Sequence, residues 1–144
     1  MLELSDDTLA LLALPSYARM AQVLPSGRPH NTILWFRYVD GEIRIISQAG
    51  SVRVRALRER PDVALLIEHP QNPHDFVDLR GAVTISDDDA AARAELVHIA
   101  RRYIGDAAPA FAAGLSDAPR VIIRLYPSRA YRHAAPAPSS SQAS

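Results

Sequence analysis

Ser51, Arg53 and Arg55 form the part of the sequence whose residue types and spacing best suit chemistry. They stand in the string GSVRVR, after a strand-like run and at the start of a helix-like one. A Ser hydroxyl, free backbone N–H groups and the positive end of a helix dipole would meet here, and guanidiniums can donate paired hydrogen bonds to phosphate oxygens. The string therefore predicts a phosphate-binding turn. The alternative is that these arginines, with Arg58 and Arg60, form the solvated face of a surface helix, and spacing alone does not separate the two.

The other reactive residue types give no comparable pattern. The chain has no cysteine, and its histidines lack the paired spacing of metal ligands: His30, His69, His74, His98 and His133. No serine stands in a Gly-x-Ser-x-Gly string, so hydrolase chemistry has no support. We therefore predict no metal site, and the sequence assigns no catalytic residue.

Charge and hydropathy exclude several classes of partner. Sixteen basic and sixteen acidic residues cancel, so no net field attracts nucleic acid or anionic lipid. The first residues, MLELSDDTLALLAL, lack the basic region and the cleavage site of a signal peptide, and no apolar run reaches the length of a membrane span. We expect a cytoplasmic protein that binds neither nucleic acid nor membranes.

A meander of three strands, followed by helices and further strands, must position the predicted turn. A short capped helix opens the chain, and strands are expected at 17–24, 29–39 and 42–47. The arginine-rich helix follows at 51–60, and further strands are expected at 63–67, 76–85 and 120–126. Between them lie a loop at 69–75, a capped helix that ends near Tyr103, and a weakly determined connection at 105–119 with room for a short helix at 108–113. On the capped helix, the stripe that contains Leu96 and Ile99 is assigned to core packing.

Six strands that open as an antiparallel meander favour an α+β fold: a six-stranded split antiparallel β-barrel with peripheral helices, rather than a Rossmann fold. Gly81 interrupts the strand 76–85 and indicates a bulge or the close approach of another backbone. We expect one domain over residues 1–133. The segment 134–144 is low in complexity, has no large apolar residue and is predicted to be a disordered tail.

Several short motifs occur in the order and spacing of one known superfamily. They are Gly27-Arg28-Pro29, Trp35-Phe36, Asp40-Gly41, Ser47, Gly50 to Leu57, Pro61-Asp62 and Leu79-Arg80-Gly81. Together they make the chain resemble the pyridoxamine 5'-phosphate oxidase-like split-barrel superfamily and, within it, the coenzyme F-420-dependent (deazaflavin) oxidoreductases. The resemblance covers residues 5–133.

This resemblance implies a homodimer with its cofactor at the subunit interface. The second strand would lie along the cofactor ring, while the end of the third strand and the start of the helix would hold the remainder, including the phosphate. Phe76 of the partner subunit would reach over the ring. The implied cofactor-binding residues are Asn31, Thr32, Ile33, Leu34, Trp35, Phe36, Ile46, Ser47, Ser51, Val52, Arg53, Arg55 and Phe76.

Two departures from the family pattern bear on the cofactor. FMN-dependent pyridoxamine-phosphate oxidases have basic residues where this chain has Asn31 and Val52. They also carry a C-terminal substrate-binding segment, and nothing after Tyr131 has that character. The resemblance therefore implies coenzyme F-420 as the cofactor, with FMN as the alternative.

The implied reaction is hydride transfer between the deazaflavin ring and a small unsaturated or carbonyl-type substrate. Such chemistry belongs to the cofactor and needs no side-chain nucleophile. The proton would come from water, from the substrate or from one of three tyrosines: Tyr17, Tyr38 or Tyr103. After the F-420-dependent and the FMN-dependent enzyme, a third hypothesis for the function belongs to a different class. It is a non-catalytic split-barrel module that binds a cofactor or a tetrapyrrole-like ligand.

Overall fold

β-strands dominate the computed structural model of the protein, which describes residues 2–136. The helices are α1 (Asp6–Leu12), α2 (Val52–Glu59), α3 (Asp89–Ile104), the 3-10 helix η1 (Gly105–Ala107) and α4 (Ala108–Ala113). The strands are β1 (Ala18–Val23), β2 (Pro29–Leu34), β3 (Arg37–Val39), β4 (Glu42–Gln48), β5 (Asp62–His69), β6 (Asn72–Ser86), β7 (Arg120–Leu125) and β8 (Arg129–Ala134). Of the predicted tail, residues 137–144 lie outside the described residues, and Ala134 is the last residue of β8.

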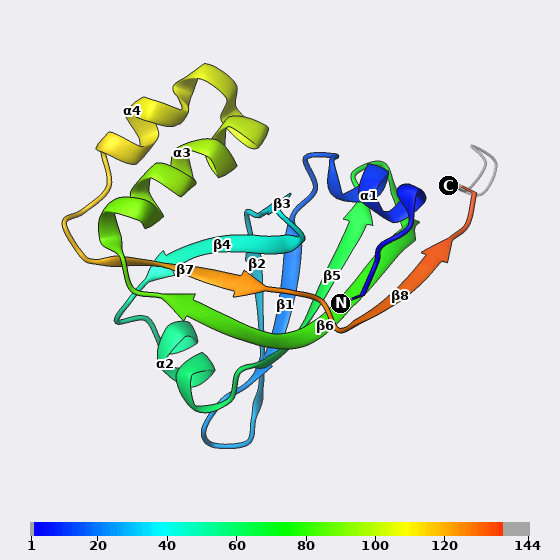
Figure 1. Ribbon diagram of the computed structural model, residues 1–144, viewed down its shortest axis with the longest axis horizontal. Coiled ribbons are helices and arrows are strands. Elements are labelled where there is room, and N and C mark those ends of the chain that lie inside the picture. The colour runs from blue at the N-terminus through cyan, green and yellow to red at the C-terminus, as the bar shows by residue number, and fades with distance from the viewer. Residues whose placement is uncertain (1, 137–144) are drawn as a thin grey trace, which may run out of the picture.

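The strands form one antiparallel sheet that curls without closing (Figure 1). Its strand order is β2-β1-β5-β6-β7-β4-β3, and β8 pairs with β6. The long strand β6 changes partners along its length: its first part lies between β5 and β8, and its last residues pair with β7. β6 therefore joins the two halves of the sheet.

Gly81 lies where β6 changes partners, and other backbone atoms come close to it there. A Cβ atom at this position would lie 3.2 Å from the carbonyl oxygen of Tyr126 and 3.3 Å from the backbone nitrogen of Ser128. These separations are shorter than ordinary van der Waals contact. The sequence-based expectation of a close backbone approach at Gly81 therefore agrees with the structure.

The predicted α+β split-barrel fold is confirmed, and the described residues contain eight strands where six were predicted. The run 29–39 divides at Trp35 and Phe36, where the chain leaves the strand that pairs with β1 and enters the strand that pairs with β4. The segment 69–75 is a hairpin in which His69 pairs with Asn72, not a long loop. The unpredicted strand β8 has the sequence RAYRHA, which contains no β-branched residue to signal a strand.

The core fills the space inside the curl of the sheet, because alternate residues of the strands point inward. α1 adds Leu11 and Leu12, and α2 adds Val54 and Leu57. The largest fully buried side chains among the described residues are Phe36, Leu12, Met20, Ile43, Ile45, Leu57, Leu65, Ile67, Leu79, Ile99, Ile123 and Leu125.

α3 and α4 lie side by side outside the curl (Figure 1), and α3 packs on β7 and β4. This pair of helices covers the edge of the sheet at which the candidate site lies. Within residues 2–136, no helix combines the length and the apolar character that crossing a membrane requires.

Candidate functional site

A cavity of about 480 Å³ lies between the facing edges of β2 and β4, beneath α3 and α4. Among residues 2–136, β2 pairs only with β1, and β3 pairs with no residue of β4 beyond Arg44. The edge of β4 near Ser47 is therefore free of a strand partner, and the cavity occupies the split of the barrel. Its lining residues are Ile33, Leu34, Trp35, Ile46, Ser47, Gln48, Ser51, Arg53, Leu96, Ile99, Phe111, Leu115 and Arg120.

Ser47, Ser51 and Arg53 form a polar cluster where β4 gives way to α2. Ser51 is the N-cap of α2, and its Oγ accepts a hydrogen bond from the backbone N–H of Val54 at 3.1 Å. The hydroxyls of Ser47 and Ser51 are 3.3 Å apart, and Arg53 Nη1 donates to Ser47 Oγ at 2.9 Å. Gln22, almost fully buried, donates to the carbonyl oxygen of Arg53 at 3.2 Å and so fixes the first turn of the helix.

The positive charge of Arg53 has no counter-charge in the described structure. No carboxylate of residues 2–136 lies within ion-pair distance of this guanidinium, and its buried Nε has no hydrogen-bond partner there. Burial lowers the pKa of Arg53 because the charged form loses hydration. Buried donors without partners are costly, so an anion bound here would gain strong charge-assisted hydrogen bonds.

Arg120 brings a second guanidinium to the same cavity. It begins β7, is only 7% exposed, and donates to the carbonyl oxygen of Ala118 at 2.9 Å and to Ser116 Oγ at 3.5 Å. Its backbone N–H donates to Asp89 at 2.7 Å. Like Arg53, its side chain forms no ion pair with any carboxylate of residues 2–136.

An aromatic stack supports one wall of the cavity. The Trp35 ring lies parallel to that of Tyr103, with centroids 4.9 Å apart, and Tyr103 is stacked in turn on Tyr17 at 5.6 Å. Phe111 of α4 meets Trp35 at 5.4 Å with its ring tilted by 45°. Such a wall suits a flat apolar ring system.

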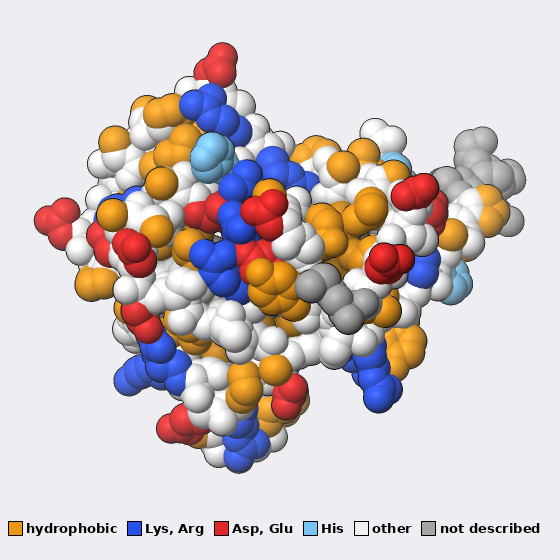
Figure 2. Space-filling view, in the orientation of Figure 1, with side chains coloured by type: hydrophobic (Ala, Val, Ile, Leu, Met, Phe, Trp, Pro, Cys, Tyr) orange, Lys and Arg blue, Asp and Glu red, His pale blue; other side chains and the backbone are white. Residues whose placement is uncertain are grey.

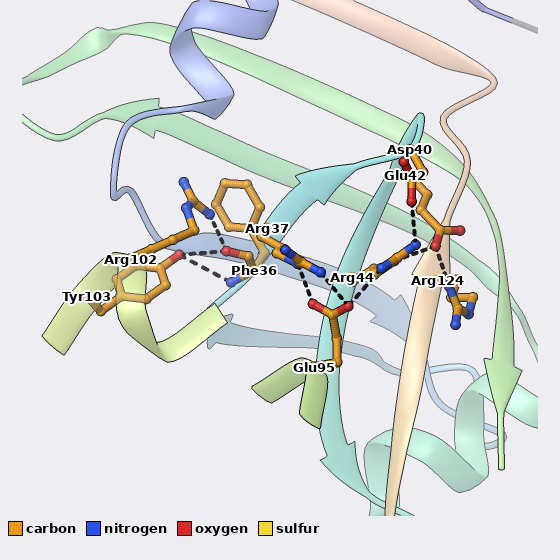
Figure 3. A network of polar contacts seen from close by, with 9 residues as sticks. All are labelled: Phe36, Arg37, Asp40, Glu42, Arg44, Glu95, Arg102, Tyr103 and Arg124. Atoms are coloured by element: carbon orange, nitrogen blue, oxygen red, sulfur yellow. Dashed lines mark hydrogen bonds and ion pairs between the residues drawn. The ribbon is translucent and has the colours of Figure 1, made fainter. Parts of the chain in front are cut away.

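A network of ion pairs fixes α3 above the cavity (Figure 3). Glu95 of α3 accepts hydrogen bonds from Arg37 Nη2 at 2.8 Å and from Arg44 Nη1 at 2.7 Å. Glu42, fully buried, accepts from Arg44 Nε at 2.6 Å and also from Arg124. Basic and acidic side chains accordingly lie intermingled over α3, β3 and β4 in Figure 2.

The same network sets the pKa of its two carboxyl groups. Burial alone would raise the pKa of Glu95, but the hydrogen bonds from Arg37 and Arg44 lower it overall. Burial alone would likewise raise the pKa of Glu42, but the hydrogen bonds from its arginine partners lower this pKa overall. Both groups are therefore ionised at neutral pH, and Glu95 holds α3 to Arg37 and Arg44 through charge.

The family model described as pyridoxamine 5'-phosphate oxidase matches residues 4–134 of the chain. The chain belongs to this family. The pyridoxamine 5'-phosphate oxidase family contains flavin-binding proteins and oxidoreductases, and the split of its barrel is where the cavity lies in the present structure.

Solved structures of the family share this fold. A structure named F-420 reductase is 27% identical with a TM-score of 0.70, and the match covers 85% of this chain and 94% of the other. A conserved hypothetical protein from Mycobacterium tuberculosis is 23% identical, with a TM-score of 0.76 and coverage of 96% and 95%. An FMN-binding protein related to pyridoxamine 5'-phosphate oxidase from Nostoc punctiforme is 20% identical, with a TM-score of 0.61 and coverage of 90% and 84%. No curated protein gave a match.

The cavity brings together just over half of the cofactor-binding residues that the family resemblance implied. From β2 and the following residue come Ile33, Leu34 and Trp35, and from β4 and α2 come Ile46, Ser47, Ser51 and Arg53. The predicted phosphate-binding turn and the aromatic wall thus face one space. The alternative that the arginines form only a solvated surface fits Arg55, Arg58 and Arg60, which are exposed, but not Arg53.

The other predicted cofactor-binding residues lie elsewhere in the subunit. Asn31 and Thr32 line a shallow depression beside Arg19 on β1, and Phe36 is fully buried in the core. Two residues of α2 face away from the cavity, together with Pro25 and Glu59: Val52 and Arg55. Phe76 lies on β6 and stacks on His133, with ring centroids 5.0 Å apart. Their roles toward a cofactor stay predictions.

None of the three candidate proton donors is among the lining residues of the cavity. Tyr103 is half-buried behind Trp35, where its hydroxyl donates to the carbonyl oxygen of Ser16 at 2.7 Å. Burial raises the pKa of Tyr103, so it keeps its proton in this place. Tyr17 is exposed at the far end of the aromatic stack, and Tyr38 lies on β3.

Six lining residues were not predicted as site residues: Gln48, Leu96, Ile99, Phe111, Leu115 and Arg120. The helical stripe with Leu96 and Ile99 indicated burial, and these side chains do pack inward, but they also form one wall of the cavity. Phe111 lies in a segment that is rich in Ala and Gly, and the sequence pattern there does not define the bounds of a helix or strand. Arg120 carried one signal, since it is a buried charge at the start of an apolar strand.

Proposed function

We propose that the protein is a homodimeric oxidoreductase that uses reduced coenzyme F-420 to transfer hydride to a small organic substrate. The observation that carries this proposal is the pairing, in one cavity, of an aromatic wall with the uncompensated guanidinium of Arg53. A deazaflavin cofactor has matching parts: a flat apolar ring system and an anionic, phosphate-bearing tail. The likeness to a structure named F-420 reductase supports the choice of cofactor.

The residues present fit such a group. Ser47, Ser51 and Arg53 would hold the phosphate, because their hydroxyl and guanidinium donors converge at the N-terminus of α2. Trp35 and Ile33 would contact the ring, and the surrounding apolar side chains would exclude water. When bound, reduced coenzyme F-420 supplies a hydride, which together with a proton from water reduces a C=C or C=O bond while the cofactor is oxidised.

A second copy of the chain would complete the site. The outward faces of β2, β1 and β5 expose Ile33, Val23 and Leu66, which are 62%, 40% and 36% exposed. In β6, Phe76 alternates with buried Val77 and so lies on this same outward face. Ile33 also lines the cavity, so a partner subunit on this face would lie next to the site.

Ligand titration tests the cofactor. Trp35 is the only tryptophan of the chain and lines the cavity, so its fluorescence reports binding there directly. We expect titration with coenzyme F-420 to quench it at lower concentrations than titration with FMN. Oxidation of the reduced cofactor is then followed with a panel of unsaturated and carbonyl acceptors. Tight FMN binding without binding of coenzyme F-420 would overturn the proposal in favour of an FMN enzyme, and binding of either without turnover would favour a non-catalytic module.

Sedimentation velocity tests the homodimer. The protein is expected to sediment as a dimer, and Ile33→Glu is expected to raise the dimer dissociation constant by roughly tenfold or more, because it places a charge in an apolar contact. Val52→Glu is the matched control, since Val52 is similarly exposed at 55% but lies on α2, away from this face. A monomeric wild-type protein would contradict the proposed assembly.

A further inference from the structure

The cavity is lined by side chains from both faces of β4 at its free edge, and we call its parts on these two faces the inner and the outer chamber. Ser47 points to the inside of the barrel with Ile45, whereas Ile46 and Gln48 alternate to the other face. That other face is the one that α3 covers, because Arg44, two residues before Ile46, reaches Glu95 of α3. The inner chamber therefore holds the serine and Arg53 cluster, and the outer chamber lies between the sheet and the helices α3 and α4.

Arg120 belongs to the outer chamber. It is paired directly with Gln48 in the register of β4 and β7, and side chains opposite one another in a sheet share a face. Its backbone N–H bonds to Asp89, the first residue of α3, which places it beneath that helix. Arg53 and Arg120 thus lie on opposite faces of the sheet edge, although both line the cavity.

The guanidinium of Arg120 has bonding capacity that the described structure does not use. Five N–H groups are available, and the hydrogen bonds to Ala118 and Ser116 engage only two nitrogen atoms. Asp89, which accepts from the backbone of Arg120, is engaged on its side-chain oxygens by Arg93 at 2.9 Å. Asp89 attracts the guanidinium of Arg120 electrostatically without forming an ion pair with it. An anionic ligand at the unused donors of this buried cation would therefore gain charge-assisted hydrogen bonds.

Apart from Gln48, the rest of the outer chamber is apolar. Leu96 and Ile99 of α3, Phe111 of α4 and Leu115 face the cavity, and Phe111 stays 43% exposed at its margin. One buried cation in a mostly apolar chamber matches a ligand with a single anionic group on an apolar body.

We propose that this outer chamber is the substrate subsite and that the substrate is an amphipathic carboxylate whose carboxyl group binds Arg120. The proposal rests on the proposed function, because it assigns the inner chamber to the cofactor phosphate. The part of the outer chamber beside Arg120 is then left for the hydride acceptor, next to the Trp35 wall that would contact the cofactor ring. Arg120 acts here as a specificity-determining residue, and Arg53 serves the cofactor.

Binding of a matched pair of probes tests the subsite without turnover. The probes are 4-phenylbutyrate and its neutral amide, 4-phenylbutyramide, titrated into the wild-type protein by calorimetry and by Trp35 fluorescence. We expect the carboxylate to bind roughly 10- to 100-fold more tightly than the amide, as is typical of a charge-assisted hydrogen bond. Equal affinities for the two probes would overturn the proposal, whatever any variant does.

Variants then test whether Arg120 causes the preference for the carboxylate over the amide. Arg120→Met is expected to abolish the preference for the carboxylate, and Arg120→Lys, which keeps the charge, to retain part of it. Arg101→Met is the matched control, because Arg101 is exposed on α3 outside the cavity. A preference that survives in Arg120→Met, with thermal unfolding unchanged, would overturn the assignment.

Titration of the same variants with coenzyme F-420 separates this proposal from the proposed function. We expect Arg120→Met to leave cofactor affinity within about twofold, since its guanidinium lies in the other chamber. A large loss of cofactor affinity in Arg120→Met would show that Arg120 holds the cofactor tail and would overturn the substrate subsite. Failure of the wild-type protein to bind coenzyme F-420, with the carboxylate preference intact, would overturn only the proposed function.

Discussion

Glu95→Gln is expected to lower the free energy of unfolding by about 3 kcal/mol at neutral pH, the typical cost of breaking a buried ion pair from one side. Glu95 is 7% exposed and is the shared partner of Arg37 and Arg44. The substitution keeps the size of the side chain and removes its charge, so Arg37 loses its counter-charge and Arg44 keeps only Glu42 and Asp40 as acidic partners (Figure 3). Urea unfolding followed by circular dichroism measures the effect.

Asp40→Asn is the matched control for Glu95→Gln. Asp40 also pairs with Arg44, at 3.3 Å, but its side chain is 76% exposed, so solvent screens the pair. We expect it to change the free energy of unfolding by less than about 1 kcal/mol. Equal effects of the two substitutions would show that the network does not hold α3.

The stabilisation from Glu95 also predicts a pH dependence. Its pKa in the folded state lies below the unfolded value of 4.5, so its contribution to stability is fully present above pH 4.5. The contribution is lost as the pH falls through the folded pKa, because the carboxyl group must then bind a proton and release its arginines. The wild-type protein is therefore expected to lose stability more steeply below pH 4.5 than Glu95→Gln does, with Glu42 accounting for part of the remaining slope. Parallel curves for the two proteins would contradict this role of Glu95.

Arg53→Ala is expected to weaken binding of coenzyme F-420 by about 1.5–3 kcal/mol, which is roughly a 10- to 150-fold rise in Kd. The reason is the loss of a guanidinium that has a free buried donor and no competing carboxylate in the described structure. Fluorescence titration measures the change. Arg60→Ala is the control at the C-cap of the same helix, since Arg60 is exposed and its side chain bonds only to the carbonyl oxygen of Pro25 among the described residues.

The same titration of Arg55→Ala tests the sequence-based prediction that Arg55 binds the cofactor. Arg55 faces away from the cavity. If Arg55→Ala weakened cofactor binding as much as Arg53→Ala, the phosphate would lie on the outer side of α2. An unchanged Kd in Arg53→Ala would show that the cluster of Ser47, Ser51 and Arg53 does not hold the cofactor.

Local signals in the sequence were enough to predict the polar half of the site. Ser51 caps the helix and Arg53 follows two residues later, so their convergence depends only on the geometry of one helix turn. Arg120 could not be predicted in the same way. It reaches the cavity through the pairing of β4 with β7, which joins residues more than seventy positions apart, and no local pattern encodes that register.

For the fold as well, features that depend on residues close in sequence were predictable, whereas features that depend on distant residues were not. The turns of the β1-β2 and β3-β4 hairpins and the capped helices were recognisable from residues close in sequence, but the two hairpins do not form the predicted continuous meander, because β2 and β4 do not pair. The division at Trp35 and Phe36 was not recognisable, because both residues continue the apolar pattern of a strand while the chain changes its pairing partner. β8 was missed since its inward residue Arg132 is balanced by ion pairs with Asp7 at 2.8 Å and Asp75 at 2.6 Å, not by apolar burial.

The two helices that cover the cavity are restrained very differently. α3 is tied down along its length: Asp89 accepts from the backbone of Arg120, Glu95 binds two arginines, and Arg102 donates to the carbonyl oxygens of Leu12 and Leu14 at 2.9 and 2.6 Å. α4 has the sequence APAFAA, so it offers no polar side chain, and glycines lie on either side of it at Gly105, with φ of 58°, and Gly114. In the described structure α4 is therefore the less restrained of the two helices. We expect substitutions in α4 to change the rates of ligand binding and release more than they change the free energy of unfolding.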